Sequence, residues 1–242
     1  MSGTMRLDRL LANLGYGSRN EVQHLARIGD VTLDGAPLRD ASLRIALAAD
    51  LPARLRVDGE PLDPLPGMAL MLHKPLGVTC SHKEAGALVY DLLPQRWRRR
   101  EPSISTVGRL DKETSGLLLL TDDGALLHRI ISPKHNVAKH YVATLARPLE
   151  GGEAALFASG TLMLEGETKP LAPAAMEALS PTSARLIVTE GRYHQARRMF
   201  AAAGNHVETL HRDRIGGLTL PADLMPSEYR QMNPVDIAAI FS

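Results

Sequence analysis

One short segment combines a carboxylate with basic side chains between two apolar runs. It reads Gly108-Arg109-Leu110-Asp111-Lys112-Glu113-Thr114-Ser115-Gly116 and continues directly into Leu117-Leu118-Leu119-Leu120-Thr121. The apolar runs predict strands at 104–107 and 117–121, so Asp111 should lie in a polar loop held at both ends. Loops positioned by a rigid scaffold often carry catalytic groups. From these residues alone, Asp111 is either a catalytic carboxylate or a turn residue that pairs with Arg109.

Three other kinds of catalytic site are poorly supported. The single cysteine, Cys80, has no partner for a zinc motif, and the pairs His206/His211 and His135/His140 are five residues apart instead of three or four. The sequence has neither a Gly-x-Ser-x-Gly elbow nor a Gly-x-x-x-x-Gly-Lys phosphate loop. We therefore expect no metal site. A lone cysteine and the lack of an apolar leader or membrane-length apolar run also predict a cytoplasmic protein.

Positive charge is concentrated in two stretches of a chain whose net charge is only +1. Residues 95–140 hold nine Lys and Arg against five Asp and Glu, and residues 185–214 hold six against three. Such local concentration indicates an anionic partner, although a solvated surface would give the same pattern. The run Arg98-Arg99-Arg100 is expected to contact phosphates.

The elements at the start of the chain are a helix over 7–14, a second helix over 18–28 and a hairpin over 31–38. Leu7, Leu10, Leu11 and Leu14 repeat at helical spacing, Ser18 and Glu21 form a capping-box pattern, and Asp34-Gly35 is a turn signal. This arrangement resembles the small RNA-binding module of the ribosomal protein S4 type. The matching residues are Arg6-Leu7-Asp8, Gly17-Ser18-Arg19, Gly29-Asp30-Val31 and Asp34-Gly35.

A proline-rich stretch, with prolines at 52, 61, 64 and 66, separates this module from the rest. Beyond it, short β-rich runs at 69–72, 77–81, 104–107, 117–121, 140–145 and 184–189 alternate with helical stretches at 124–131, 152–159 and 192–203. The expected fold class is α+β. An S4-like RNA-binding domain with linker should occupy 1–62, and a mixed domain built on a largely antiparallel sheet should occupy 63–242.

Five motifs in the same order give the chain a family resemblance. They are the S4-like module, His73-Lys74-Pro75-Leu76-Gly77, the segment Gly108 to Gly124, Lys139-His140-Tyr141, and Glu190 to Met199, with Gly204 to Gly217 extending the last. Over about residues 5–232 the sequence resembles the RsuA/RluB/E/F family of bacterial ribosomal-RNA pseudouridine synthases, most closely the RsuA type that modifies small-subunit RNA. One departure is Ser227, which stands where the family usually has glycine.

The resemblance implies that uridine is isomerised to pseudouridine without a cofactor, a redox agent or a metal. The essential aspartate of the family falls on Asp111, which must be ionised to act as a nucleophile or to stabilise a sugar cation. A nearby arginine would keep it ionised, and Arg197 is the first candidate, with Arg198 as the alternative. Tyr141 matches the family tyrosine that packs against the target base; a half-buried strand aromatic is the other interpretation.

The remaining site residues are basic. The residues expected to bind RNA are Lys74, Arg109, Lys139, Arg192, Arg198 and Arg19. Several of them could equally serve to order the motif loops. The partner should be ribosomal RNA of the small subunit or an assembly intermediate, bound by a monomer without a membrane or small-molecule cofactor. A large-subunit target and a non-catalytic assembly factor on the same fold are the alternatives.

Overall fold

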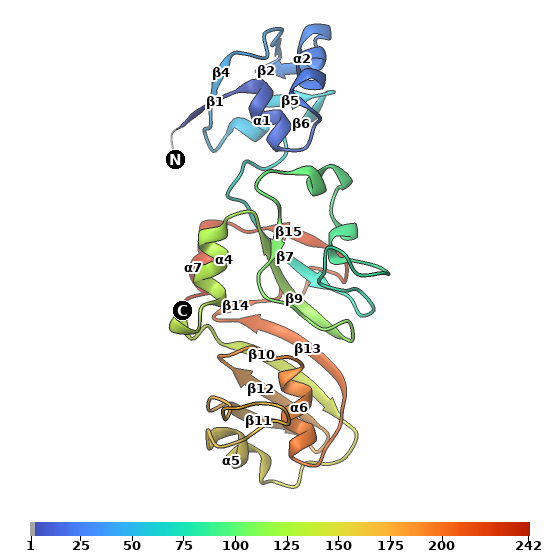
Figure 1. The fold of residues 1–242 in the computed structure, drawn as a ribbon, viewed down its shortest axis with the longest axis vertical. Helices are drawn as coiled ribbons and strands as arrows, with labels where there is room; N and C mark the ends of the chain where they lie inside the picture. The colour runs from blue at the N-terminus through green and yellow to red at the C-terminus, as the bar shows by residue number, and fades with distance from the viewer. Residues whose placement is uncertain (1–2) are drawn as a thin grey trace. The chain divides into compact units, whose positions relative to one another are not determined.

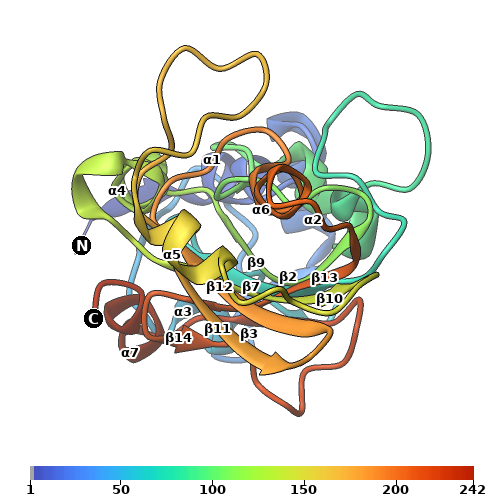
Figure 2. The ribbon, with the colours of Figure 1, turned by 90° about the horizontal axis from the view of Figure 1, so that it is seen from below.

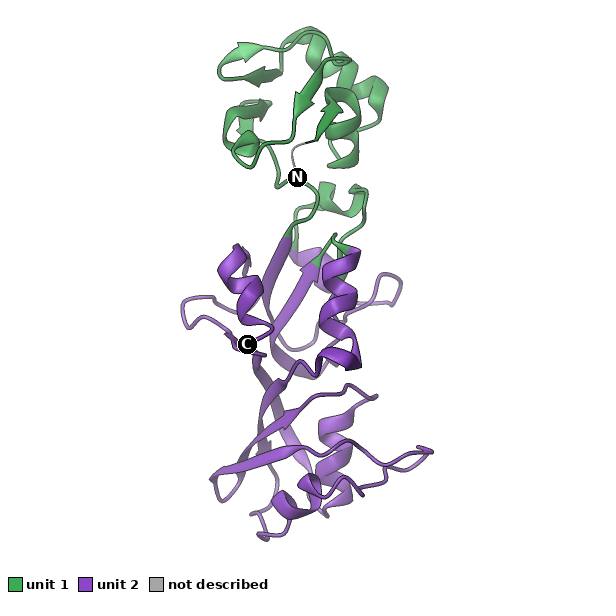
Figure 3. Ribbon diagram, turned by 90° about the vertical axis from the view of Figure 1, so that its left-hand side faces the viewer, with its two compact units in different colours: residues 1–68, 93–105, 121–123 green, residues 69–92, 106–120, 124–242 purple. Residues whose placement is uncertain are grey.

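A computed structural model describes residues 3–242 (Figure 1). The chain divides into two compact units, coloured separately in Figure 3. The first takes in the chain up to Met68 together with Leu93–Ser105 and Thr121–Asp123, and the second holds the remainder. The expected domain boundary after residue 62 lies close to the end of the first long segment, and it stays a prediction. No helix among residues 3–242 is long and apolar enough to cross a membrane.

Two helices form the centre of the first unit, as predicted. Helix α1 spans Leu7–Asn13, and α2 spans Arg19–Ile28. The capping box is present, since the Ser18 side chain accepts from the backbone N–H of Glu21 while the Glu21 carboxylate accepts from that of Ser18. The leucines of α1 are completely buried, so the helical leucine spacing marks the core face.

Short strands complete the module. Strand β2 (Val31–Leu33) pairs with β3 (Ala36–Pro37) in the predicted hairpin, and Asp34 and Gly35 both have positive φ, as a tight hairpin turn requires. The sheet order is β3-β2-β5-β6, and β1 pairs separately with β4. The other elements are β1 (Thr4–Arg6), β4 (Arg44–Ala46), α3 (Leu51–Arg54), β5 (Leu55–Val57) and β6 (Glu60–Pro61).

The later segment of the first unit is tied to these helices by polar contacts. It contains the short 3₁₀ helix η2 (Gln95–Arg99). The Arg96 guanidinium binds both carboxylate oxygens of Asp63 at 2.5 and 2.6 Å, and the backbone N–H of Glu101 donates to the Asn13 carbonyl at 2.7 Å. The proline-rich linker is therefore anchored through Asp63.

A nine-stranded mixed sheet, mostly antiparallel, forms the framework of the second unit. The main strand order is β11-β12-β10-β13-β9-β7-β15, with β14 on β13 and β8 on β9. Strand β13 runs parallel to β9, which sets Arg212 opposite Gly116. The strands are β7 (Ala69–Lys74), β8 (Ser105–Thr106), β9 (Thr114–Thr121), β10 (Lys139–Leu145), β11 (Ala175–Ser180), β12 (Ser183–Val188), β13 (Val207–Ile215), β14 (Leu218–Thr219) and β15 (Tyr229–Gln231).

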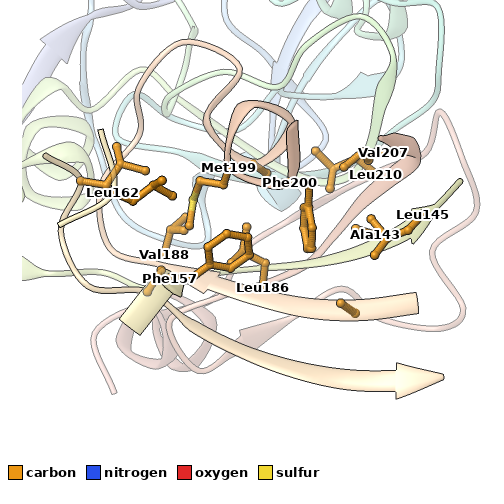
Figure 4. Close-up of a cluster of buried hydrophobic side chains, with 14 of the residues drawn as sticks. Ala143, Leu145, Phe157, Leu162, Leu186, Val188, Met199, Phe200, Val207 and Leu210 are labelled. Carbon is orange, nitrogen blue, oxygen red and sulfur yellow. The ribbon is translucent and has the colours of Figure 1, made fainter. Parts of the chain in front are cut away.

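Helices cover this sheet through two apolar clusters. Helix α6 (Gln195–Ala202) lies on one side of β10 and β13 (Figure 2) and buries Met199 and Phe200 against them (Figure 4). Phe157 of α5 (Glu153–Ala158) meets the Phe200 ring edge to face, with centroids 5.3 Å apart. Helices α4 (Gly124–Ile131) and α7 (Pro234–Ala239) pack with the second cluster. The 3₁₀ helices η1 (Val89–Leu92) and η3 (Pro133–His135) complete the elements.

One predicted strand is wrong. The stretch 77–81 makes only an isolated bridge between Thr79 and Leu88 and is otherwise irregular. Its backbone instead bonds to the loop that carries Lys112, since the Gly77 N–H donates to the Lys112 carbonyl at 2.9 Å.

Candidate active site

Asp111 lies in the loop between β8 and β9, as the sequence predicts. The backbone fixes the loop, since the Thr114 N–H donates to the Asp111 carbonyl at 3.0 Å. The Asp111 side chain keeps 32% of its surface exposed. The carboxylate is thus held in a defined place and remains open to a ligand.

Lys74 fixes the same loop from the end of β7. Its side chain is completely buried, and the ammonium group donates to the carbonyls of Pro75, Lys112 and Thr114 at 2.9, 3.4 and 2.8 Å. Burial lowers the Lys74 pKa, while the carboxylates of Glu113 and Asp111 oppose that effect. The expectation that Lys74 binds RNA is corrected, because a buried ammonium with three carbonyl acceptors cannot reach a phosphate. Lys74 orders the loop.

The imidazole in contact with the Asp111 carboxylate belongs to a histidine that was not among the predicted site residues. Nε2 of His194 lies 3.4 Å from Oδ1 of Asp111. His194 precedes α6 with φ 49° and ψ 32°, a left-handed conformation that non-glycine residues adopt mainly at special sites. This turn directs the imidazole toward a loop 83 residues earlier in the chain.

Arg197 reaches the loop, but it binds the loop's backbone. Its guanidinium donates to the Glu113 carbonyl at 2.7 Å and to the Val207 carbonyl at 2.8 Å. Arg198, on the next position of α6, instead bonds Glu167 at 3.0 Å. Among residues 3–242, the Asp111 carboxylate has the His194 imidazole within 4 Å and neither arginine. Arg197 therefore braces the loop, and the expected direct pairing is not present.

Tyr141 is half-buried on β10, and a buried arginine holds its hydroxyl group. Nη1 of Arg212 donates to the Tyr141 oxygen at 3.2 Å, while Nε of Arg212 donates to the Leu117 carbonyl at 2.8 Å. Arg212 is 3% exposed, and its Nη2 has no hydrogen-bond partner among the described residues. A buried donor without a partner is costly, and such a group commonly awaits a ligand or water. Arg212 was not predicted as a site residue from the sequence.

The other basic residues that were expected to bind RNA differ in exposure and in their bonding partners. Arg109 is exposed. Lys139 donates to the Thr189 carbonyl at 3.3 Å, and burial lowers its pKa. Arg192 is 22% exposed and takes part in ion pairs with Glu167 and Glu190. These ion pairs fit a loop-ordering role for Arg192, and the expected RNA binding by Arg192 and Arg198 stays a prediction.

Arg19 belongs to the first unit. Its guanidinium binds the buried Asp8 carboxylate at 2.8 Å and stays half exposed. It borders a hollow of about 640 Å³ lined by Arg9, Ala12, Asn13, Ser18, Arg19, Glu101 and Pro102. Its expected role in RNA binding stays a prediction.

A metal site is not apparent in the described part of the chain. Residues 3–242 contain no group of three or more His, Cys, Asp or Glu side chains arranged to hold a metal ion. The buried Cys80 thiol has its pKa raised, mainly by burial. The side chains that could take part in chemistry are thus an open carboxylate in contact with an imidazole, and an aromatic ring held by a buried guanidinium.

Comparison with known proteins defines the class. Residues 69–202 match the family described as RNA pseudouridylate synthase, and residues 5–49 match the S4 domain. A solved structure described as a pseudouridylate synthase is 36% identical, with a TM-score of 0.68, and the match covers 98% of this chain and 99% of that one. The chain belongs to the RNA pseudouridylate synthase family, and it is an isomerase that carries an S4 domain.

Individual relatives are similar over their whole length. The ribosomal small subunit pseudouridine synthase A of Escherichia coli strain K12 is 42% identical over 240 residues, covering 98% of this chain and all of the relative. The protein of the same name from Yersinia pestis is 39% identical, covering 98% of each. The family resemblance expected from the five motifs is confirmed.

Proposed function

We propose that this enzyme converts one uridine of small-subunit ribosomal RNA to pseudouridine, with Asp111 as the catalytic carboxylate. The relatives that match over the full length carry the name of a small-subunit pseudouridine synthase, which supports the choice of RNA. The observation that carries the role of Asp111 is its open carboxylate on a loop fixed by Lys74 and Arg197. Ribosomal RNA as substrate fits the expected cytoplasmic location.

The reaction exchanges one glycosidic bond for another. The bond from the sugar carbon C1′ to N1 of uracil breaks, the base turns, and a bond from C1′ to C5 forms. The proton on C5 is lost and N1 gains one, so the atoms balance without an oxidant or reductant. Asp111 either attacks the sugar covalently or stabilises the cation formed when the base leaves; both roles require an ionised carboxylate.

The neighbouring side chains have separate roles in this proposal. Tyr141 supplies an apolar face for a base that has left its stack. Arg212 keeps the tyrosine hydroxyl in place and offers its second amino group to the substrate. His194 lies where its imidazole can orient the Asp111 carboxylate.

One alternative is separated by experiment: an enzyme for large-subunit RNA would use the same chemistry on another uridine. The non-catalytic assembly factor considered from the sequence is set aside, because the chain belongs to the synthase family. The monomeric state also stays an expectation.

The test maps pseudouridine in both ribosomal RNAs from cells that lack the gene. The proposal expects one small-subunit site to revert to uridine and to be restored by the wild-type gene, but not by the Asp111→Asn gene. Loss of a large-subunit site would select the alternative. Restoration of the lost site by the Asp111→Asn gene would overturn the role of Asp111.

A further inference from the structure

An exposed aromatic ring lies next to the catalytic loop. Tyr193 leaves 71% of its surface exposed, which is unusually high for a large aromatic residue. One face of its ring stacks on the His194 imidazole, with centroids 3.8 Å apart and planes inclined by 18°. His194 in turn contacts the Asp111 carboxylate. The two rings thus form a stack that begins beside the reacting carboxylate and ends in solvent.

The backbone that carries this stack is firmly held on its N-terminal side. Besides its two ion pairs, Arg192 donates to the carbonyls of Lys169 and Pro170 at 2.8 and 2.7 Å. Its backbone N–H donates to the Gln195 side chain at 2.8 Å, and that side chain bonds Glu190 at 3.0 Å. The turn is fixed by side chains that have no part in the chemistry.

The C-terminal side is held as well. Arg198 donates to the Tyr193 carbonyl at 3.2 Å and to the Glu167 carboxylate at 3.0 Å. Glu167 therefore joins Arg192 and Arg198 and closes the frame around Tyr193 and His194. An exposed side chain in a merely solvated loop would not need such a frame, whereas a binding surface gains from preorganisation.

We propose that the Tyr193–His194 stack is a binding site for a nucleobase that flanks the target uridine in the RNA. This inference rests on the proposed function, and it assigns to Tyr193 a task separate from that of Tyr141. When the target base leaves its stack, its neighbour loses a stacking partner, and the free face of Tyr193 replaces that partner. Stacking accepts any base, so the site contributes to affinity and to positioning and not to reading of sequence.

The expected size of the effect follows from base–aromatic stacking. Removing one stacked ring costs ~1–3 kcal/mol, which corresponds to about a 5- to 150-fold loss in affinity. The loss should appear in KM and leave kcat nearly unchanged, because the flanking base does not react.

The first experiment compares three variants on small-subunit ribosomal RNA of Escherichia coli, both free and in partly assembled particles. Tyr193→Ala should raise KM by about 5- to 150-fold, whereas Tyr193→Phe should behave as wild type because it keeps the ring. Met225→Ala removes another exposed apolar side chain, 59% exposed, and serves as the matched control. Equal KM values for Tyr193→Ala and wild type, or an equal loss in Tyr193→Phe, would overturn the proposal.

A second experiment detects the stack without requiring turnover. Short RNAs carry 2-aminopurine at successive positions around a central uridine, and quenching of its fluorescence reports stacking. We expect quenching at one flanking position with wild type and Tyr193→Phe, and none at that position with Tyr193→Ala. Quenching that is the same in all three proteins, or absent with wild type, would contradict base stacking on Tyr193. If wild type quenches the probe but forms no pseudouridine in ribosomal RNA, the proposed function fails, while the proposed base-binding site at the Tyr193–His194 stack is still supported.

Discussion

At the scale of single residues, the carboxylate that we propose as catalytic lies on a loop positioned by groups that do not bond to it. Lys74 and Arg197 both bind carbonyl oxygens of the loop, from a strand and a helix respectively. The Asp111 carboxylate is left with His194 as its neighbour. This division keeps the carboxylate open while the backbone that carries it is rigid.

Arg212 should be required for turnover through Tyr141. Arg212→Lys removes the fork that bonds the Leu117 carbonyl and the Tyr141 hydroxyl together, and lysine cannot reproduce that geometry. We expect kcat to fall by about ten- to a hundredfold, the size of a hydrogen bond to a charged group. Steady-state kinetics with circular dichroism as a folding check would measure it.

The control is Tyr141→Phe, which removes only the hydroxyl. If Arg212 acts by holding Tyr141, the double variant should be little worse than the poorer single variant. Fully additive losses would show that Arg212 acts elsewhere.

Asp8 should make the first unit sensitive to acid. Its completely buried carboxylate is bonded by Arg6 and Arg19, and these bonds, that of Arg6 foremost, hold its pKa well below the usual 3.8. Because the folded-state pKa is depressed, this stabilisation is present above about pH 4 and is lost as pH falls toward the folded-state pKa. Asp8→Asn should lower the free energy of unfolding by about 1–3 kcal/mol at pH 7 and flatten its decline in acid.

Denaturant unfolding at several pH values would test this dependence. Asp223→Asn is the matched control, since Asp223 pairs with Arg230 on the surface with 73% of its side chain exposed. If the free energy of unfolding of the wild type fell no more steeply in acid than that of Asp8→Asn, the proposed role of the Asp8 carboxylate would be contradicted.

At the scale of elements, the close approach of β9 and β13 depends on one glycine. Gly116 has φ +111°, and a Cβ built there would lie 2.2 Å from the Arg212 carbonyl oxygen. Gly116→Ala should therefore displace β13 and with it Arg212. Gly151→Ala provides the control, because Gly151 has φ +94° but open space around it.

Both alanines should incur the strain of a positive φ, about 1–2 kcal/mol. Gly116→Ala should be destabilised by about 1–3 kcal/mol more and should lose activity, because only there does the new methyl group meet backbone. Thermal unfolding and turnover of both variants measure this. Equal stability and activity of the two would show that the strands separate without consequence.

Elements with a local signal were predictable from the sequence, and those shaped by their partners were not. The capping box of α2 and the turn at Asp34-Gly35 are set within a few residues, and both predictions are confirmed. Strand β13 escaped prediction because its buried Arg212 interrupts the apolar alternation, and β11 because it is exposed along most of its length. The left-handed turn at His194 and the direction of Arg198 depend on contacts with distant loops.

At the scale of the whole molecule, the three arginines of the basic stretch at 98–100 differ in burial. Arg98 and Arg99 are exposed, whereas Arg100 is buried with Asp122, each side chain 1% exposed and the charged groups 3.0 Å apart. Arg100 also donates to the Pro64 carbonyl at 2.8 Å. The expectation that all three contact phosphates is corrected, because Arg100 holds the fold of the first unit.

A salt titration of RNA binding should distinguish the exposed Arg98 and Arg99 from the buried Arg100. Replacing Arg98 and Arg99 by glutamine should reduce the slope of log K against log salt by up to about 1.4, at ~0.7 for each phosphate that is no longer neutralised. Arg100→Gln should instead lower stability, since it leaves Asp122 buried without its cation. Filter binding over a range of salt, with thermal unfolding in parallel, would test both. An unchanged slope in the double variant would assign these two arginines to a solvated surface.

For the enzyme as a whole, the decisive question is whether Asp111 performs the chemistry or only shapes the loop. Pseudouridine formation by Asp111→Asn answers it, measured under single-turnover conditions on small-subunit RNA that the wild-type enzyme modifies. We expect no product above background, with RNA affinity and thermal stability close to wild type, because the amide conserves shape and removes charge and nucleophilicity. Measurable turnover by Asp111→Asn would refute the catalytic role of this carboxylate.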